Sequence, residues 1–482
     1  MKPILNLLLT FVITATLFAQ TTYVWTGSAN NSFSTAGNWS PFRQIGLTSD
    51  VLIFETTGSL NVQNVNQVTV GQLIVRNNTS LTLSPSTGNA KVLSINGGSG
   101  EDLNIENGSS LTISGNDPKL SIYLNANSTA SIFGNLTFSG TIAHTFNAND
   151  QNAIHFKSGS NFYQSCPGNI FNTTSQNNVV VFENGSKFTV SNVNALSPFG
   201  LSNQSKVTFN TGSEFIVAAS NPNILKLNGR KYSDITINEN ININTEDALT
   251  NEFTCDKITV KQNASLSMIN SGLNSGIINI KGNINCLGSI NFNNSSRENI
   301  ELHFNGETEQ SFAGTGTYSF PINLGTVYFD NDISILRERG IRINCAVLQT
   351  RGTVNTNNYK FVVVGGYRMS NGGGITNQGQ IISEKNNTTI PQQYSISQNY
   401  PNPFNPSTKI DFTLPNESNV KIVVYDIIGS EVGKIAEGKF NSGFHAISFD
   451  AQNLSSGTYF YKIIAESDKG NFTKTLKMTL IK

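Results

Sequence analysis

The sequence predicts an all-β fold, and three observations support that prediction. Charged residues make up 13% of the 482 residues, about half the usual share in soluble domains. Asparagine supplies about one residue in seven, far above ordinary usage, and no long stretch has apolar residues at helical spacing. Short runs of alternating apolar and polar residues follow one another instead, separated by Asn, Gly or Ser. Clear runs are Leu81/Leu83, Leu103/Ile105, Leu111/Ile113, Leu120/Ile122/Leu124, Ile235/Ile237, Ile258/Val260, Ile278/Ile280 and Ile341/Ile343.

One phrase recurs in the middle of the chain: small polar residues, then Ser or Lys, then two apolar residues separated by one position. It occurs as NNTSLTL, NGSSLTI, NGSKFTV, NQSKVTF, TGSEFIV and QNASLSM, and more weakly as SGSNFYQ and STASIFG. Its first apolar residues are 19 to 30 positions apart along Leu81, Leu111, Ile132, Phe162, Phe188 and Val207. Such a period is typical of stacked β-coils, in which no coil is stable alone and Gly and Asn form the turns. Residues 20–370 are therefore predicted to form a right-handed parallel β-helix.

Two parts of this region resemble modules of large secreted bacterial β-helix proteins. One is the start, with Tyr23, Trp25, Gly27 and Trp39, and the other is the stretch 300–365 with its NG…Q…GTG and GTV segments. The two tryptophans are interpreted as a lid that covers the open edge of the first coil. Stacking of a sugar on them is the alternative.

The four cysteines are Cys166, Cys255, Cys286 and Cys345. The last three have similar surroundings (FTCDKITV, INCLGSINF and INCAVLQT), which favours small buried residues lining one edge of the core. Disulfides are the alternative for an exported protein. No CxxC pair is present.

The N-terminus has the layout of a secretory signal peptide. Lys2 is followed by an apolar stretch from Ile4 to Phe18, and the sequence turns polar after Ala19. Residues 1–19 are predicted to be removed by cleavage between Ala19 and Gln20. The stretch is shorter than the roughly 20 apolar residues of a spanning helix, so a membrane anchor is the weaker alternative, and no transmembrane helix is expected in the mature chain.

The composition changes near Asn371, and residues 371–394 are predicted to be a polar linker. Five of the thirteen prolines lie between Pro391 and Pro415. About seven short alternating strands are expected in residues 395–482, which suggests an immunoglobulin-like β-sandwich, entered through an extended, proline-fixed strand.

Residues 395–482 closely resemble the type A C-terminal sorting domain of type IX secretion substrates. The resemblance rests on the YPNPFNPST opening, the VYD segment with a following Gly, the LSSGTY segment and the final strand. The residues that carry it are Tyr400, Pro401, Asn402, Pro403, Phe404, Asn405, Pro406, Tyr425, Asp426, Gly429, Gly457, Tyr459 and Lys477. It implies export by the type IX machinery, followed by release or by attachment to surface lipopolysaccharide. A plain sandwich domain that binds another molecule is the alternative.

The expected β-helix raises the question of an enzyme active site, because such folds carry polysaccharide lyases and hydrolases. Asp330 and Asp332 stand beside a cluster of Arg337, Glu338, Arg339 and Arg342. This group is interpreted as a solvated turn, with an anion or uronate site as the alternative. The pairs Glu101/Asp102 and Glu246/Asp247 are also interpreted as turns, and His144, His155, His303 and His445 are scattered.

No catalytic residue, metal ligand or cofactor is assigned, since no metal-binding or nucleotide-binding motif is present. The formal net charge is zero, which argues against a nucleic-acid partner. The sequence thus predicts a non-catalytic, structural or adhesin-like protein on the outer surface of a Gram-negative bacterium, with glycans as candidate partners. A carbohydrate-active β-helix enzyme and a glycan-binding passenger are the alternatives.

Overall fold

The structure is a computed structural model of the chain. It describes residues 20–44, 46–98, 100–171, 178–192, 199, 205–219, 221–225, 231–244, 252–269, 276–292, 300–320, 326–369, 374–376, 394–399 and 401–482. The predicted signal peptide, Tyr400 and residues 377–393 of the predicted linker lie outside them.

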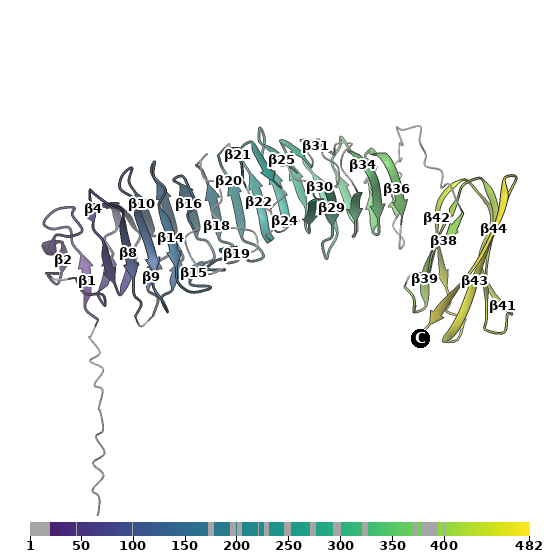
Figure 1. Cartoon of the computed structure of the whole chain (residues 1–482), viewed down its shortest axis with the longest axis horizontal. Helices are drawn as coiled ribbons and strands as arrows, with labels where there is room; N and C mark the ends of the chain where they lie inside the picture. Colours follow the sequence, from purple (N-terminus) through teal and green to yellow (C-terminus); the bar gives the residue numbers. More distant parts are fainter. Residues whose placement is uncertain are drawn as a thin grey trace, which may run out of the picture.

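The N-terminal region is a parallel β-solenoid whose strands stack coil on coil in a row (Figure 1). Along the chain, strands follow one another on a first, a second and a third face, although the coils of β15/β16 and β17/β18 have no third-face strand among the described residues. The first face contains β1 (Thr22–Trp25), β3 (Val51–Phe54), β6 (Gln72–Val75), β9 (Leu103–Ile105), β12 (Ala130–Ile132), β15 (Ile154–Phe156), β17 (Val180–Phe182), β19 (Val207–Phe209), β26 (Gly276–Ile280), β29 (Ile300–Phe304) and β32 (Thr326–Phe329). The second face contains β4 (Gly58–Val65), β7 (Thr79–Pro85), β10 (Ser110–Ser114), β13 (Asn135–Ser139), β16 (Asn161–Ser165), β18 (Lys187–Val190), β20 (Glu214–Val217), β27 (Ile284–Cys286), β30 (Gln310–Ala313), β33 (Ile333–Leu336), β35 (Thr353–Asn355) and β37 (Gly374–Thr376).

The third face contains β5 (Val68–Val70), β8 (Lys91–Ile95), β11 (Leu120–Leu124), β14 (Thr145–Ala148), β21 (Asn221–Leu225), β23 (Ile241–Asn244), β25 (Ser265–Ile269), β28 (Ser289–Asn291) and β31 (Thr317–Ser319). Four longer strands turn a corner and serve two faces: β22 (Lys231–Ile237), β24 (Glu252–Val260), β34 (Ile341–Thr350) and β36 (Phe361–Met369). β37 pairs with β35 in parallel, so coil pairing continues through Thr376, past the predicted end of the solenoid at residue 370.

Equivalent side chains lie directly above one another from coil to coil. On the second face one unbroken register runs through Leu60, Leu81, Leu111, Leu136, Phe162, Phe188, Phe215, Ile235, Ile258, Ile284, Phe312 and Ile335. On the first face another runs through Leu52, Leu73, Leu103, Ala130, Ile154, Val180 and Val207. Almost all of these side chains are buried, so the predicted in-register apolar core and the all-β fold class are confirmed.

The repeated sequence phrase does not mark one position in every coil. Ile132 and Val207 lie on the first face, in β12 and β19, whereas Leu81 and Phe188 lie on the second. The QNASLSM copy forms β25 on the third face. Each corner needs the same chemistry, a polar turn followed by an inward apolar residue, so the same phrase serves at all three corners.

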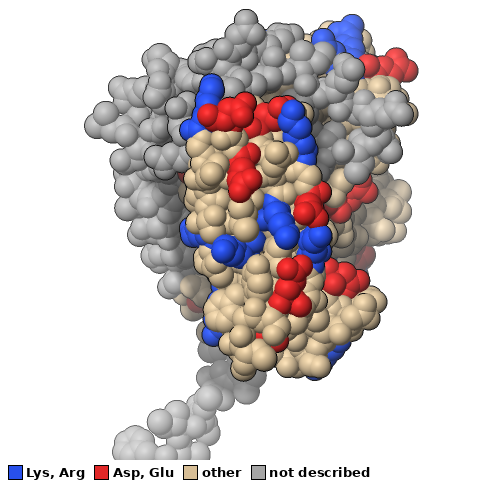
Figure 2. Space-filling view, turned by 90° about the vertical axis from the view of Figure 1, so that its right-hand side faces the viewer, with Lys and Arg blue, Asp and Glu red and all other residues tan. Residues whose placement is uncertain are grey.

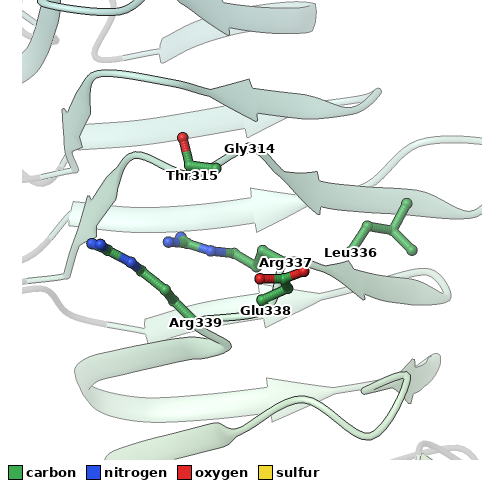
Figure 3. Close-up of a pocket in the computed structure, with 6 residues that line it drawn as sticks. All are labelled: Gly314, Thr315, Leu336, Arg337, Glu338 and Arg339. Carbon is green, nitrogen blue, oxygen red and sulfur yellow. The ribbon is translucent and has the colours of Figure 1, made fainter.

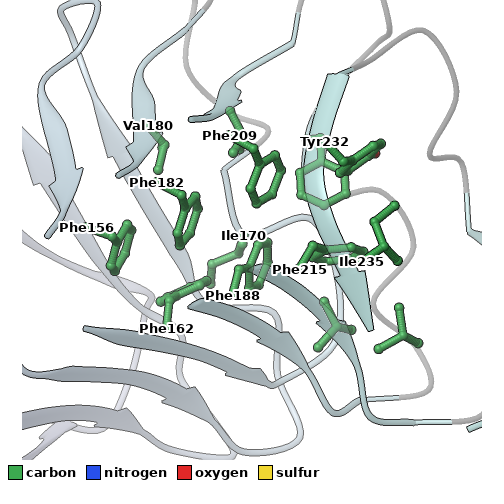
Figure 4. Packing of buried hydrophobic residues seen from close by; sticks show 14 of the residues in the cluster. Phe156, Phe162, Ile170, Val180, Phe182, Phe188, Phe209, Phe215, Tyr232 and Ile235 are labelled. Carbon is green, nitrogen blue, oxygen red and sulfur yellow. The ribbon is translucent and has the colours of Figure 1, made fainter. Parts of the chain in front are cut away.

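Aromatic rings fill the core in the middle of the solenoid (Figure 4). Phe156 and Phe182 stack nearly parallel with 4.5 Å between ring centroids. Phe182 in turn stacks on Phe188 at 5.4 Å and on Phe209 at 5.2 Å. Pairs of this kind add about 0.5–1.5 kcal/mol beyond the area they bury, so the rings link successive coils as well as opposite faces.

The turns explain the unusual asparagine content. Every described non-glycine residue with positive φ is an asparagine: Asn64, Asn77, Asn78, Asn127, Asn152, Asn178, Asn263, Asn357 and Asn358. Asn tolerates left-handed backbone geometry better than any other side-chain-bearing residue except Asp. The coil corners therefore select Asn or Gly.

The first coil is covered by a lid, as the sequence predicted. β2 (Trp39–Ser40) follows the short helix η1 (Ala36–Asn38) and pairs antiparallel with β1. Trp25 and Trp39 are 3% and 4% exposed and pack edge to face at 5.0 Å, and both rings also contact Phe54. Buried rings cannot stack on a sugar, so the alternative role for the tryptophans is wrong.

The four cysteines are buried and unpaired. They do not line one edge of the core, however. Cys255 lies in register with Ile280 of a first-face strand, while Cys286 lies in register with Val260 on the second face. The similar sequences around these cysteines therefore reflect similar turns at different corners. They do not show that the cysteines stack above one another.

Residues 394–482 form two antiparallel sheets that enclose a second core. The smaller sheet contains β38 (Ser395–Ile396), β39 (Ser407–Leu414) and β42 (Gly443–Asp450). The larger sheet contains β40 (Ser418–Tyr425), β41 (Glu431–Phe440), β43 (Gly457–Ser467) and β44 (Gly470–Leu480). The arrangement fits the predicted β-sandwich.

No helix in the described part of the chain is long and apolar enough to cross a membrane.

Candidate functional site

The proline-rich opening of the C-terminal domain is fixed to its last strand. Phe404 is buried against Phe449, and its backbone N–H donates to the carbonyl of Thr479 at 2.9 Å. Asn402 Oδ1 accepts the N–H of the same Thr479 at 2.8 Å. Pro401, Pro403 and Asn405 are exposed and Pro406 is half-buried. Among the described residues of the motif, Phe404 and Thr408 are buried, and the prolines and Asn405 are exposed or half-buried.

A network of buried hydrogen bonds joins the proline-rich opening to Tyr461 of β43. Tyr461 donates its hydroxyl proton to the carbonyl of Ser397 at 2.7 Å and accepts the N–H of Asn399 at 2.9 Å. Burial raises the pKa of Tyr461 to about 12, although the hydrogen bond from Asn399 opposes that shift. The amide of Asn399 donates to Thr408 Oγ1 at 3.0 Å, and that hydroxyl donates to the Pro401 carbonyl.

The VYD segment ends in a locked hairpin turn. Asp426 Oδ1 accepts the backbone N–H groups of Ile428 at 3.0 Å and Ser430 at 2.8 Å. Gly429 has φ +85°, a conformation that glycine adopts without strain. Ile427 and Ile428 project from the turn and are 72% and 83% exposed.

The remaining motif residues lie in β43 and β44, toward the end of the sandwich that also holds the hairpin turn after β40. Tyr459, which follows Gly457 at the start of β43, donates its hydroxyl proton to the Ser455 carbonyl at 2.7 Å. Lys477 is exposed, and its carbonyl accepts a hydrogen bond from the Gln398 amide. The structure thus brings the opening and the final strand together, with Tyr425 and Asp426 at the hairpin turn and Tyr400 outside the described residues.

Figure 2 views the molecule from the side on which the C-terminal domain lies, and positive and negative side chains are interspersed there. Ion pairs such as Lys434–Glu437 and Lys439–Glu417 belong to this domain. Among the described residues, no single-sign patch dominates the visible face.

In the solenoid, Asp330 belongs to a small polar cluster instead of an open turn. His303 Nδ1 lies 3.1 Å from Asp330 Oδ2, and His303 Nε2 lies 3.4 Å from Glu301 Oε2. Burial lowers the pKa of His303, but hydrogen bonds and charges from Asp330 and Glu301 outweigh burial and leave that pKa above its usual value. The imidazole stacks on Tyr328 with 4.2 Å between ring centroids, and Arg351 binds Asp330 at 2.7 Å.

The local sequence pattern does not reveal this cluster. His303 and Asp330 are 27 residues apart, which is within the repeat period, and that spacing is the signal that could have joined them. Among the other acidic pairs, Asp102 is buried and accepts the N–H groups of Gly98 and Thr129 at 2.8 Å each. Glu246 and Asp247 lie outside the described residues.

Many of the solenoid's charges pair between neighbouring coils. Three ion pairs of 2.7 Å lie at the corner after the first face: Arg76–Glu55, Lys157–Glu183 and Arg351–Asp330. Two more join residues in direct register on the second face: Lys187–Glu214 and Lys257–Asp234. These charges favour one register of the stack over a shifted one.

Within the described residues no group of three or more His, Cys, Asp or Glu side chains is arranged to hold a metal ion. Of the predicted cluster of Arg337, Glu338, Arg339 and Arg342, the first three residues border a cavity of about 450 Å³ at a coil corner, together with Gly314, Thr315 and Leu336 (Figure 3).

Comparisons with known proteins assign the C-terminal domain. Residues 398–477 match the family described as secretion system C-terminal sorting domain. No curated protein matches the chain. Among solved structures, the enzymatically active domain of bacteriophage CBA120 tailspike protein 4 aligns with 12% identity and a TM-score of 0.16, over 89% of this chain. The alignment covers 64% of the tailspike chain, less than two thirds of its length, and a TM-score that low supports no argument about fold or function.

The sorting domain indicates handling by the type IX secretion machinery and delivery to the cell surface or the extracellular space of a bacterium. The locked opening, the hairpin turn and the sandwich around them are the structural form of the matched residues. The chain therefore joins a parallel β-solenoid passenger to a C-terminal sorting domain of the type IX secretion class.

Proposed function

We propose that the passenger is a non-catalytic, adhesin-like rod that is displayed on the outer membrane of a Gram-negative bacterium and contacts glycans. In this proposal residues 1–19 are a cleaved signal peptide, residues 20–370 carry the passenger function, and residues 371–394 link it to the sorting domain 395–482. Surface lipopolysaccharide is the proposed attachment point.

One observation carries the proposal: outward polar residues repeat in register on the first face. A single row runs through Asn279, His303, Tyr328 and Gln349, which are all half-buried, and its preceding member Thr254 is buried. Successive members of such a row are about 4.8 Å apart. Many similar weak contacts along a rod add up to useful avidity when the partner also repeats, as a glycan chain does.

The export part of the proposal is tested by deleting residues 395–482. The truncated protein should accumulate in the periplasm, while the full chain reaches the cell surface, where antibody labelling of intact cells detects it. A sorting-domain variant with the exposed Lys434→Gln change is the matched control and should reach the surface normally. Surface display of the truncated protein would refute the assignment of this domain as the export signal.

The glycan part is tested with the purified full chain on a glycan array and in a binding assay on cells of its own and other species. Weak binding to several repeating glycans, with tighter binding to longer chains of each glycan, would support multivalent binding along the rod. Binding that does not depend on chain length would contradict a multivalent mechanism.

A carbohydrate-active enzyme is the second candidate, and one observation favours it. Glu301 and Asp330 come from adjacent coils and converge on His303, and glycosidases use pairs of carboxylates. The imidazole occupies the space between them, however, so we favour binding. Scission of a polysaccharide by the wild type that disappears in Glu301→Gln would reverse this preference.

A further inference from the structure

The cavity at the corner between the second and third faces has features that the structural role of a turn does not explain. It lies between the turn after β30, which includes Gly314 and Thr315, and the turn after β33, where Leu336 is followed by Arg337, Glu338 and Arg339. Its volume of about 450 Å³ is within the range of small-molecule sites, roughly 300–1,000 Å³. The two turns belong to successive coils.

Arg337 is held rigidly at the back of this cavity. It is only 7% exposed, its guanidinium lies 4.5 Å from the centre of the Tyr318 ring, and its NH2 group donates to the Gly316 carbonyl at 2.6 Å. Its Nε has no hydrogen-bond partner. Burial lowers the pKa of Arg337, Tyr318 and Cys286 oppose that shift, and the neighbouring Arg339 charge adds to it more weakly.

No ion pair joins Arg337 or Arg339 to a carboxylate of the described chain. Figure 3 shows the two guanidinium groups extending toward the same side of the cavity, below Thr315. A buried cation without a counter-ion is costly, and Arg337 is such a cation, whereas many of the solenoid's other charges are paired between coils. Arg337, with the exposed Arg339 beside it, therefore points to an anionic ligand.

The other lining groups narrow the class of anion. Glu338 would repel a multiply charged ion such as phosphate, but its oxygens can accept hydrogen bonds from sugar hydroxyls. The Thr315 hydroxyl adds a further donor and acceptor. Leu336 is 51% exposed and offers an apolar surface to the C–H face of a ring.

We propose that this cavity binds the carboxylate of an acidic sugar residue, a uronate, within a glycan chain. Arg337 and Arg339 hold the carboxylate, Glu338 and Thr315 bind hydroxyls, and Leu336 contacts the ring. The inference rests on the proposed glycan-contacting function and names the ligand class for one site on the rod.

The experiment measures binding of trigalacturonate to the full chain by calorimetry, with the carboxyl-reduced trisaccharide and inorganic sulfate as comparison ligands. The acidic trisaccharide should bind at least tenfold more tightly than either. Arg339→Gln should weaken it about tenfold, which corresponds to 1.4 kcal/mol. Arg76→Gln, which removes an arginine from the corner after the first face near the start of the solenoid, is the matched control and should bind like the wild type.

Arg337→Gln could unfold its coil, so Glu338→Gln serves as the second variant and should weaken binding of the trisaccharide while leaving binding of sulfate unchanged or stronger. Equal affinity for sulfate and the trisaccharide would overturn the sugar assignment, and so would an unchanged affinity in Arg339→Gln. If neutral glycans bind on the array but trigalacturonate does not, this inference fails and the proposed function stands. If no glycan binds at all, both fail.

Discussion

The solenoid and the sorting domain build their cores in opposite ways. In the solenoid each inward side chain meets its equivalent one coil earlier and one coil later, as Phe162 meets Leu136 and Phe188. In the sorting domain the contacts that close the core join distant parts of the chain, as between Phe404 and Thr479. Stability of stacked coils is a sum over neighbours, whereas a small sandwich unfolds as one unit. A defect should therefore stay local in the solenoid and spread through the whole sorting domain.

The largest effect is expected from Phe182→Ala. This change removes a fully buried ring that stacks on three others, and such truncations cost about 3–5 kcal/mol. Hydrogen exchange should accelerate in the coils around β17 and remain unchanged in the sorting domain. Phe42→Ala, at a side chain that is 65% exposed, is the control and should change neither. Faster hydrogen exchange in both the solenoid and the sorting domain would contradict the expectation that a defect in the solenoid stays local.

A smaller effect is expected from Tyr461→Phe. Removing the hydroxyl leaves the Ser397 carbonyl and the Asn399 N–H without their partner, which costs about 1–3 kcal/mol. The denaturant midpoint of the whole sorting domain should fall, measured on the tyrosine signal and on β44 amides alike. Tyr425→Phe is the control, and a decrease limited to the strand that carries Tyr461 would contradict unfolding as one unit.

A pH-dependent effect is expected in the solenoid. The pKa of His303 is raised in the folded state, so its contribution is fully present below the unfolded-state pKa of about 6.5. That contribution is lost as the pH rises through the folded-state pKa. Asp330→Asn should lower this pKa and remove about 1 kcal/mol of stability on the acidic side. An NMR titration of the imidazole checks the first point, and Asp332→Asn, which has no contact with His303, should leave the titration unchanged.

The smallest effect is expected from Lys434→Gln. The side chains of its ion pair with Glu437 are about half exposed, and water screens such pairs almost completely. The midpoint of the sorting domain should not change within error at either low or high salt. A clear salt-dependent decrease would show that surface charges contribute to the sandwich as the coil-to-coil pairs contribute to the solenoid.

The sequence could predict features that depend on local pattern. Alternation at Leu111/Ile113 showed a strand with one buried face, and the proline-rich opening with Asp426 and Gly429 marked the sorting domain. It could not say which face a repeat copy occupies: Ile132 and Val207 carry the same phrase as Leu81 but lie on a different face. The polar turn that precedes an inward residue is the same at every corner, and coils differ in length.

The sequence also could not predict which side chains from neighbouring coils contact one another. The partners of Asp330 lie one coil away on either side, and only the register of the finished stack reveals them. The cavity near Arg337 depends on two turns 21 residues apart. A sequence shows each turn as polar and exposed, and it cannot show that one guanidinium is buried between them.

The unbroken register on the second face has a consequence for how the protein can change in length. Leu111, Leu136 and Phe162 occupy interchangeable positions, so excising the segment from one to the next would leave ends that meet at a matching rung. A gene that loses or duplicates such a segment would encode a shorter or longer rod with its lid and its export domain untouched. The length of the rod is thus a property that recombination can adjust in whole steps.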